Sequence, residues 1–235
     1  MIIAISAGRE GSKGFPGKNT FKLGAHPMLA YPIMAAVNCR LVDCVMFTSD
    51  SEVMDKIAES YGVNLNLSRP KELATDKALL EDVYVWAYKE RIQSFIEFVV
   101  LLMSNAPCIT SKMMEEMILI LRENEEADSI CTVSKYNMFH PNRSRKFVDK
   151  YLVPYVPECI DGLTTCDRDC SDDSYIYDCS CAVVRPYCLE KIEEGLPPQK
   201  WLGQKILGYK QRTPAIDIDY AWQVGQLQYW LQENW

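Results

Sequence analysis

The sequence predicts an α/β protein in which a mostly parallel β-sheet is flanked by helices. Three observations support this fold class. Short apolar segments alternate with segments of helical spacing, and the first apolar segment runs directly into a glycine-rich loop. The 235 residues are 48% hydrophobic, which provides a sizeable core. Strands that alternate with helices at this spacing are joined by right-handed crossovers, so the expected architecture is Rossmann-like.

Each predicted strand is a short apolar segment. Residues 98–103 are continuously apolar, which is typical of a strand buried on both faces of a parallel sheet. Residues 63–67 alternate apolar and polar side chains, which is the period of a strand. In chain order, the predicted strands are residues 2–5, 42–49, 63–67, 98–103, 129–135 and 181–184.

The segments between these strands have the spacing and the boundary residues of helices. Pro32 is compatible with the first helix because it falls in the first turn. Asp50 or Ser51 caps the second helix, and Gly62 ends it as the residue that follows the C-cap. The apolar residues that keep helical spacing in the second helix are Val53, Ile57, Ala58 and Tyr61. The other predicted helices are residues 28–39, 79–91, 112–124 and 220–232.

Residues 136–177 interrupt the alternation of strands and helices. This part of the chain is rich in Pro, Asn, Asp and Cys, and it holds only short extended pieces such as residues 151–156. We therefore expect residues 1–235 to form a single domain with an insertion at 136–177. The insertion is predicted to be a subdomain that covers the active site as a lid or makes a dimer contact.

Composition and charge exclude several classes of protein. The net charge of −7 argues against a general surface for nucleic acids or anionic membranes, and no apolar run approaches the ~18 residues of a membrane-spanning helix. Because no secretion signal is recognisable, we expect a cytoplasmic protein whose ten cysteines are reduced. One dense group of cysteines lacks paired C-x-x-C spacing, so free thiols are favoured over structural zinc. This group comprises Cys159, Cys166, Cys170, Cys179 and Cys181.

The glycine-rich loop after the first strand is a candidate phosphate-binding site. Glycine recurs at positions 8, 11, 14 and 17, which permits positive φ angles and lets backbone N–H groups approach a ligand. The loop is not a P-loop, because Gly11 to Lys18 holds one residue too many between its glycines and Asn19 replaces the magnesium-binding Ser or Thr. It also lacks G-x-G-x-x-G, which excludes dinucleotide binding. Arg9, Lys13 and Lys18 would neutralise a triphosphate as charge develops on a leaving pyrophosphate.

A second candidate site lies near the C-terminus, where Asp217 and Asp219 flank Ile218. Alternate residues of an extended segment face the same way, so the two carboxylates are predicted to project together while Ile216 and Ile218 enter the core. Carboxylates, substrate phosphates and waters are the usual ligands of Mg²⁺. Asp217 and Asp219 are therefore predicted metal ligands, and an N-cap of the following helix is the alternative role of Asp219.

Together these motifs closely resemble the signature of the acylneuraminate cytidylyltransferases, which activate sialic acids and related acid sugars as CMP conjugates. The run Ala-Gly-Arg-Glu-Gly-Ser-Lys-Gly-Phe-Pro-Gly-Lys-Asn at 7–19 is a specific match. Residues 48–51 resemble the S-T-D-S at a strand end of this family, and residues 69–74 resemble its R-P-x-E-L-A, which Asp76 follows in the usual place. Residues 217–219 resemble its metal-binding D-x-D, so the resemblance covers almost the whole chain.

The resemblance implies a nucleotidyltransferase that binds CTP and Mg²⁺ and acts on a small acidic acceptor as a homodimer. A substrate oxygen would attack the α-phosphorus of CTP, release pyrophosphate and leave CMP on the acceptor. Asp217 and Asp219 would hold Mg²⁺ and would act in catalysis together with Arg9 and Lys18. The residues implied in nucleotide binding are Ala7, Gly8, Arg9, Ser12, Lys13, Lys18, Asn19, Arg69 and Asp76.

The sequence departs from the family pattern in the region expected to bind the acceptor. Sialic-acid enzymes have L-L-Q-P-T-S-P-L-R-T where this chain has Leu-Leu-Met-Ser-Asn-Ala-Pro-Cys-Ile-Thr at 101–110. Met103 cannot make the hydrogen bonds of a glutamine, and Ile109 cannot pair with a carboxylate. Residues 177–180 also lack the usual R-P-N-G. The candidate acceptor-binding residues are Asn105, His140, Arg143 and Arg145.

Three functions remain open at this point. The first is transfer of CMP to an acidic acceptor, either sialic-acid-like or another acid sugar. A small phosphonate is the alternative acceptor, because other branches of the resembled family use one. The third hypothesis is a nucleotide-binding regulatory protein without turnover, and the intact aspartate pair argues against it.

Overall fold

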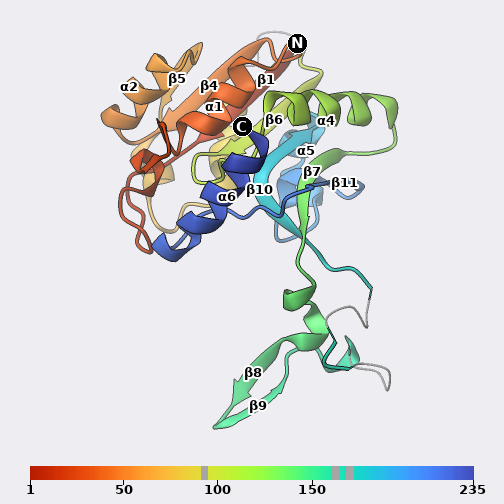
Figure 1. Ribbon diagram of the computed structural model, residues 1–235. Coiled ribbons are helices and arrows are strands. Elements are labelled where there is room, and N and C mark those ends of the chain that lie inside the picture. The colour runs from red at the N-terminus through yellow and green to blue at the C-terminus, as the bar shows by residue number, and fades with distance from the viewer. Residues whose placement is uncertain (91–94, 160–164, 168–171) are drawn as a thin grey trace.

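The structure, a computed structural model, describes residues 1–90, 95–159, 165–167 and 172–235. Its centre is a seven-stranded sheet with the strand order β11-β7-β10-β6-β1-β4-β5 (Figure 1). The strands of this sheet are β1 (Ile2–Ala7), β4 (Cys44–Ser49), β5 (Leu65–Ser68), β6 (Phe98–Met103), β7 (Ser129–Lys135), β10 (Tyr175–Val184) and β11 (Ile206–Lys210).

Most neighbouring strands of the sheet run parallel. β1 pairs in parallel with β4 and β6, β4 pairs in parallel with β5, and β11 pairs in parallel with β7. β10 is antiparallel to both of its neighbours, β6 and β7. The predicted fold class, an α/β protein with a mostly parallel sheet and flanking helices, is therefore confirmed.

Helices cover both faces of the sheet because its central strands are apolar on both sides. The helices are α1 (Ala30–Val37), α2 (Glu52–Ser60), α3 (Leu80–Lys89), α4 (Ser111–Glu123), α5 (Tyr187–Glu190) and α6 (Val224–Asn234). β1 is buried along its whole length. Its residues Ile3 and Ile5 pack in a core with α3 and α5, whereas Ile2 and Ala4 pack in a second core with α1 and α4.

The predicted elements agree with the structure except at a few places. β6 and β7 have the predicted bounds, and Gly62 has the positive φ of 91° expected of a residue that ends a helix. The predicted apolar face of α2 is wrong at Val53, which is 60% exposed, because Met54 faces the core in its place, whereas Ala58 is buried as predicted. The helix predicted at 79–91 ends at Lys89, and Arg91 lies outside the described residues.

β11 was not predicted, and two short hairpins lie outside the main sheet. β2 (Lys22–Leu23) and β3 (His26–Pro27) form the first hairpin. β8 (Arg145–Val148) and β9 (Tyr151–Pro154) form the second, which projects away from the sheet and is called the arm below (Figure 1). The arm lies within the predicted insertion, whose role as a lid or dimer contact stays a prediction. No helix in the described part of the chain is long and apolar enough to span a membrane.

Candidate active site

A cleft of about 400 Å³ opens beside Ala7 and Met103, the last residues of β1 and β6. The carboxyl ends of adjacent parallel strands meet at one edge of a sheet, which is where open α/β folds bind ligands. The volume suits a ligand the size of a nucleotide. All but one of the predicted nucleotide-binding residues line the cleft, namely Ala7, Gly8, Arg9, Ser12, Lys13, Lys18, Asn19 and Arg69.

The glycines of the loop meet different structural demands. Gly17 has a φ of 71° and precedes a short 3-10 helix at Lys18–Thr20. At Gly14, a Cβ atom would lie 2.4 Å from the carbonyl oxygen of Asp219, so only glycine lets the loop approach the aspartate segment. Gly11 has no atom within 4 Å of such a Cβ. Its place in the regular spacing therefore reflects neither a close approach nor a positive φ in this structure.

Two cations of the loop converge on Asp76, the predicted nucleotide-binding residue that does not line the cleft. Arg9 Nη1 lies 2.9 Å from Asp76 Oδ1, and Lys13 Nζ lies 2.6 Å from Asp76 Oδ2. The hydrogen bonds from Lys13 and Arg9 lower the pKa of the Asp76 carboxyl. The loop thus holds two cations at a spacing that binds both oxygens of one anionic group.

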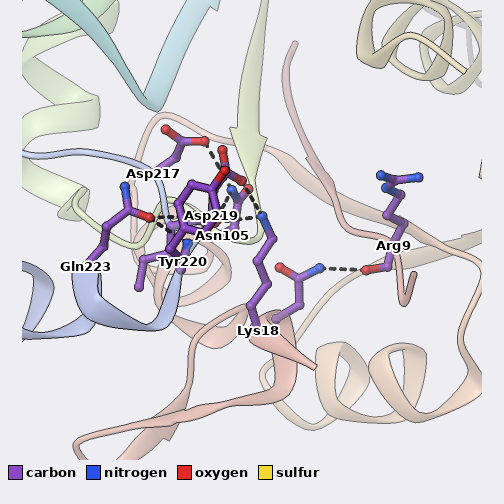
Figure 2. Close-up of polar contacts among 9 residues, drawn as sticks. Arg9, Lys18, Asn105, Asp217, Asp219, Tyr220 and Gln223 are labelled. Carbon is purple, nitrogen blue, oxygen red and sulfur yellow. Dashed lines mark hydrogen bonds and ion pairs between the residues drawn. The ribbon is translucent and has the colours of Figure 1, made fainter. Parts of the chain in front are cut away.

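Lys18 connects the loop to the aspartate segment (Figure 2), and Asn19 closes the loop on itself. Lys18 Nζ donates hydrogen bonds to the Ile218 carbonyl oxygen at 2.6 Å and to Asp219 Oδ1 at 2.7 Å. The Asn19 amide donates to the Arg9 carbonyl oxygen at 2.9 Å, which fixes the start of the loop. Lys18 therefore joins the two predicted motifs, which are far apart in the sequence.

The aspartate segment is held by side chains from other parts of the chain (Figure 2). Asn105 Nδ2 donates to Asp217 Oδ2 at 3.2 Å and to the Ile218 carbonyl oxygen at 3.0 Å. Gln223 Oε1 accepts the backbone N–H groups of Asp219 and Tyr220, both at 2.7 Å. Asn105, predicted to bind the acceptor, therefore positions an aspartate and also lines the cleft.

The two aspartates occupy different environments. Ile218 is fully buried between them, as predicted, whereas Ile216 is only half-buried. Asp219 lines the cleft and Asp217 lies deeper, where burial and the charge of Asp219 raise the pKa of its carboxyl. The alternative role of Asp219 as an N-cap is wrong, because Tyr220 occupies that position before the 3-10 helix at Ala221–Gln223.

The donor set fits a hard cation such as Mg²⁺. Two carboxylates that lie close enough for one to raise the pKa of the other create a negative potential that a divalent cation relieves. Among the described residues, no group of three or more His, Cys, Asp or Glu side chains is arranged to hold a metal. A cation held by Asp217 and Asp219 would therefore take its remaining ligands from substrate oxygens, Asn105 or water.

Arg69 reaches the cleft from the segment after β5. It is largely buried, its Nη2 donates to the Thr48 carbonyl oxygen at 2.9 Å, and burial lowers the pKa of its guanidinium. Its Nε and the Oδ1 of Asn19 are buried atoms with no hydrogen-bond partner in the described part of the chain. Both residues line the cleft, while these two atoms lie beneath its surface.

The other predicted acceptor-binding residues do not line the cleft. His140 Nδ1 accepts the Asn142 N–H at 3.2 Å, and Arg143 donates to the Cys166 carbonyl oxygen at 3.1 Å. Arg145 donates to backbone carbonyl oxygens of its own turn. Their role in acceptor binding stays a prediction. Met103 and Ile109 stand where the family has glutamine and arginine; Met103 lines the cleft and Ile109 is buried in the core.

Among the cleft and its supporting residues that were not predicted from the sequence are Tyr220 and Gln223, which adjoin the aspartate segment. Tyr220 lines the cleft, and its ring would lie 3.3 Å from a Cβ atom added at Gly14. Gln223 follows Tyr220 by three residues, which is the spacing of a capping box, and this spacing is the one sequence signal that points to Gln223.

The predicted cysteine group lies partly outside the described residues. Cys179 and Cys181 are free thiols, and burial raises the pKa of both.

The fold and the site are those expected of a nucleotide-binding α/β protein, because a cationic glycine-rich loop contacts the aspartate segment at the carboxyl ends of parallel strands. The chain belongs to the cytidylyltransferase family, whose sequence profile matches residues 3–151. The predicted family resemblance is thereby confirmed.

Individual relatives agree with this membership. The chain is 36% identical to the N-acylneuraminate cytidylyltransferase of Escherichia coli over 150 residues, which cover 64% of this chain and 35% of that protein. It is 32% identical to the CMP-N,N'-diacetyllegionaminic acid synthase of Legionella pneumophila over 108 residues, 45% of this chain and 47% of that protein. The chain thus spans less than half the length of these curated relatives.

A solved structure shows the shared fold. The CMP:2-keto-3-deoxy-manno-octonic acid synthetase, complexed with CTP, superposes with a TM-score of 0.68 at 13% identity. The superposition covers 100% of this chain and 99% of that one. At this level of identity the likeness concerns the arrangement of the sheet and helices.

Proposed function

We propose that this protein is a Mg²⁺-dependent cytidylyltransferase that transfers CMP from CTP to an acid sugar and releases pyrophosphate. The observation that carries the proposal is the link from Lys18 to Asp219 and the Ile218 carbonyl, which joins the loop to the aspartate segment across the cleft. Relatives named for neuraminic, legionaminic and keto-deoxy-octonic acids support an acid-sugar acceptor.

The loop supplies electrostatic stabilisation in the proposed reaction. An oxygen of the acceptor attacks the α-phosphorus of CTP, and negative charge grows on the departing pyrophosphate. Arg9 and Lys13 already bind both oxygens of Asp76, so a phosphate group can take the same hydrogen bonds. Fixed cations of this kind stabilise the developing charge without reorganisation. Mg²⁺, when bound by Asp217 and Asp219, would supply further positive charge at the phosphates.

The nucleoside half of CTP has its own candidate partners. Arg69 and Asn19 both line the cleft, and each carries a buried polar atom without a partner, Nε of Arg69 and Oδ1 of Asn19. A cytosine or ribose toward which these side chains turned would pair with both atoms and remove the cost of leaving them buried without a partner. We assign these two residues to base or ribose recognition on this ground.

The proposal is tested by measuring pyrophosphate release from CTP with a panel of acid sugars and with a small phosphonate. We expect release with at least one acid sugar, and removal of divalent metal should abolish it. The Asp217→Ala/Asp219→Ala variant should lose at least about a hundredfold in kcat, since it removes both carboxylates of the site.

The matched control is Glu125→Ala/Glu126→Ala, which removes two exposed carboxylates outside the cleft and should keep its activity. Full turnover in the Asp217→Ala/Asp219→Ala variant would refute the metal assignment. Release with the phosphonate alone would identify that acceptor class instead. Binding of CTP without release for any acceptor would favour the regulatory hypothesis.

A further inference from the structure

An irregularity of β10 turns a carboxylate into the protein core. Tyr177 pairs with Val133 and Ala182 pairs with Cys131, so residues 178–181 lie opposite the single residue Thr132. Such a bulge redirects side chains that would otherwise alternate across the strand. Asp178, the first residue of the bulge, is only 2% exposed as a result.

Neutral donors surround the Asp178 carboxylate. Thr132 Oγ1 donates to its Oδ1 at 2.6 Å, and Ser134 Oγ donates to its Oδ2 at 2.8 Å. The backbone N–H of Ser180 adds a third hydrogen bond at 3.1 Å. No ion pair of Asp178 occurs in the part of the chain that the structure describes. A buried carboxylate without a cation is costly to retain for stability alone.

The hydrogen bonds continue from Asp178 to the aspartate segment. Ser134 Oγ also accepts the backbone N–H of Ala215 at 2.8 Å. A serine hydroxyl has one proton, so when it is donated to Asp178 the oxygen lone pairs face Ala215. The carbonyl oxygen of Ala215 accepts a hydrogen bond from the Tyr136 hydroxyl at 3.1 Å. Both peptide groups that flank Ala215 are therefore fixed, two residues before Asp217.

We propose that Asp178 is a positioning residue that acts through Ser134 to hold the Ala215–Asp219 segment in place for metal binding and catalysis. Asp178 does not line the cleft and contacts neither aspartate through a hydrogen bond in the described structure. The inference rests on the proposed function. It adds a residue from β10 to the site described above.

Thr132 and Ser134 offer a matched pair of variants. Both hydroxyls bind the same buried carboxylate, but only Ser134 contacts Ala215. Thr132→Val and Ser134→Ala should therefore lose similar stability in urea unfolding, because each leaves Asp178 with one donor fewer. Only Ser134→Ala should lower kcat, by about tenfold to a hundredfold, and KM for CTP should stay within about threefold in both variants.

Binding of Mn²⁺, followed by electron paramagnetic resonance in the presence of CTP, gives a readout that does not depend on turnover. We expect Ser134→Ala and Asp178→Asn to weaken it about tenfold, and Thr132→Val to leave it unchanged. Equal losses in Thr132→Val and Ser134→Ala, in kcat and in Mn²⁺ binding, would reduce Asp178 to a structural role and overturn the proposal. If the wild-type protein releases no pyrophosphate, the proposed function fails while the Mn²⁺ comparison still decides the role of Asp178.

Discussion

Gly14 is the residue of the loop at which one added methyl group should do the most damage. A Cβ atom there would lie 2.4 Å from the Asp219 carbonyl oxygen, so the loop and the aspartate segment would have to separate. We expect Gly14→Ala to lower kcat/KM for CTP by about tenfold to a hundredfold, since small displacements of catalytic groups have large effects. Steady-state pyrophosphate release measures this loss.

Gly11→Ala is the matched control, because a Cβ atom at Gly11 meets nothing within 4 Å. It adds the same methyl group to the same loop and should leave kcat/KM within about twofold of the wild-type value. Equal losses of kcat/KM in the two variants would contradict this prediction. They would show that activity depends on the flexibility of the loop and not on its close approach to Asp219.

At the scale of single residues, the loop could be predicted because its members are neighbours in the sequence. The spacing of the glycines and the three cations Arg9, Lys13 and Lys18 were sufficient to propose an anion site. The partners of the aspartates could not be predicted in the same way. Asn105 was assigned to the acceptor, yet it binds Asp217, and Asp178 reaches the segment only because a bulge redirects it. Contacts of this kind depend on tertiary structure, which no local pattern specifies.

At the scale of elements, prediction succeeded best where the apolar run was unbroken. β6 is continuously apolar and buried, and its bounds were predicted without error. β11 was missed because it is an edge strand in which exposed and half-buried residues alternate around Gly208. In α2, the neighbours Val53 and Met54 are both apolar, and packing against α1 and β4 decides that Met54 is the one that is buried.

The turn that leads into β11 is held by Asp128. Its Oδ2 accepts the backbone N–H groups of Gln204 and Lys205 at 2.6 and 2.9 Å, and its Oδ1 accepts the Tyr187 hydroxyl at 2.7 Å. Burial raises the pKa of the Asp128 carboxyl, but these hydrogen bonds outweigh burial and lower it overall. A carboxyl whose pKa is lower in the folded state stabilises the fold above its unfolded-state pKa, and this contribution disappears as the pH falls through the folded-state pKa.

Asp128→Asn should therefore lower the free energy of unfolding by about 1–2 kcal/mol at pH 7, because charge-assisted hydrogen bonds become neutral ones. The difference from wild type should shrink as the pH falls from about 4, where the carboxyl of the unfolded chain takes up its proton, through the lowered folded-state pKa. Urea unfolding at pH 7 and at about pH 3 measures both effects. Glu126→Gln, at an exposed position nearby in the sequence, is the control and should change little at either pH. An equal loss at low and neutral pH would contradict a role for the ionised carboxylate.

At the scale of the whole molecule, the sheet with its helices and the arm differ in how they bury apolar residues. The sheet has an apolar core on each face, whereas Phe147 and Leu152 of the arm are 73% and 62% exposed. These two residues lie opposite each other in the register of β8 and β9, so they form one apolar face. An isolated two-stranded hairpin is only marginally stable in water, and such a face is usually covered by a partner.

We propose that the arm of a second copy covers this face, so that the protein is a homodimer with two-fold symmetry. A symmetric pair buries the same surface on each copy, which requires no partner of different chemistry.

Light scattering coupled to size-exclusion chromatography should give twice the chain mass for the wild-type protein. Phe147→Glu/Leu152→Glu places charges on the face and should yield a monomer that stays folded, because the cores on both sides of the sheet do not include these residues. Leu119→Glu, which adds a charge at an exposed apolar position on α4, should remain dimeric. A wild-type monomer at 0.1 mM, or a dimer that survives both arm substitutions, would refute the proposed interface.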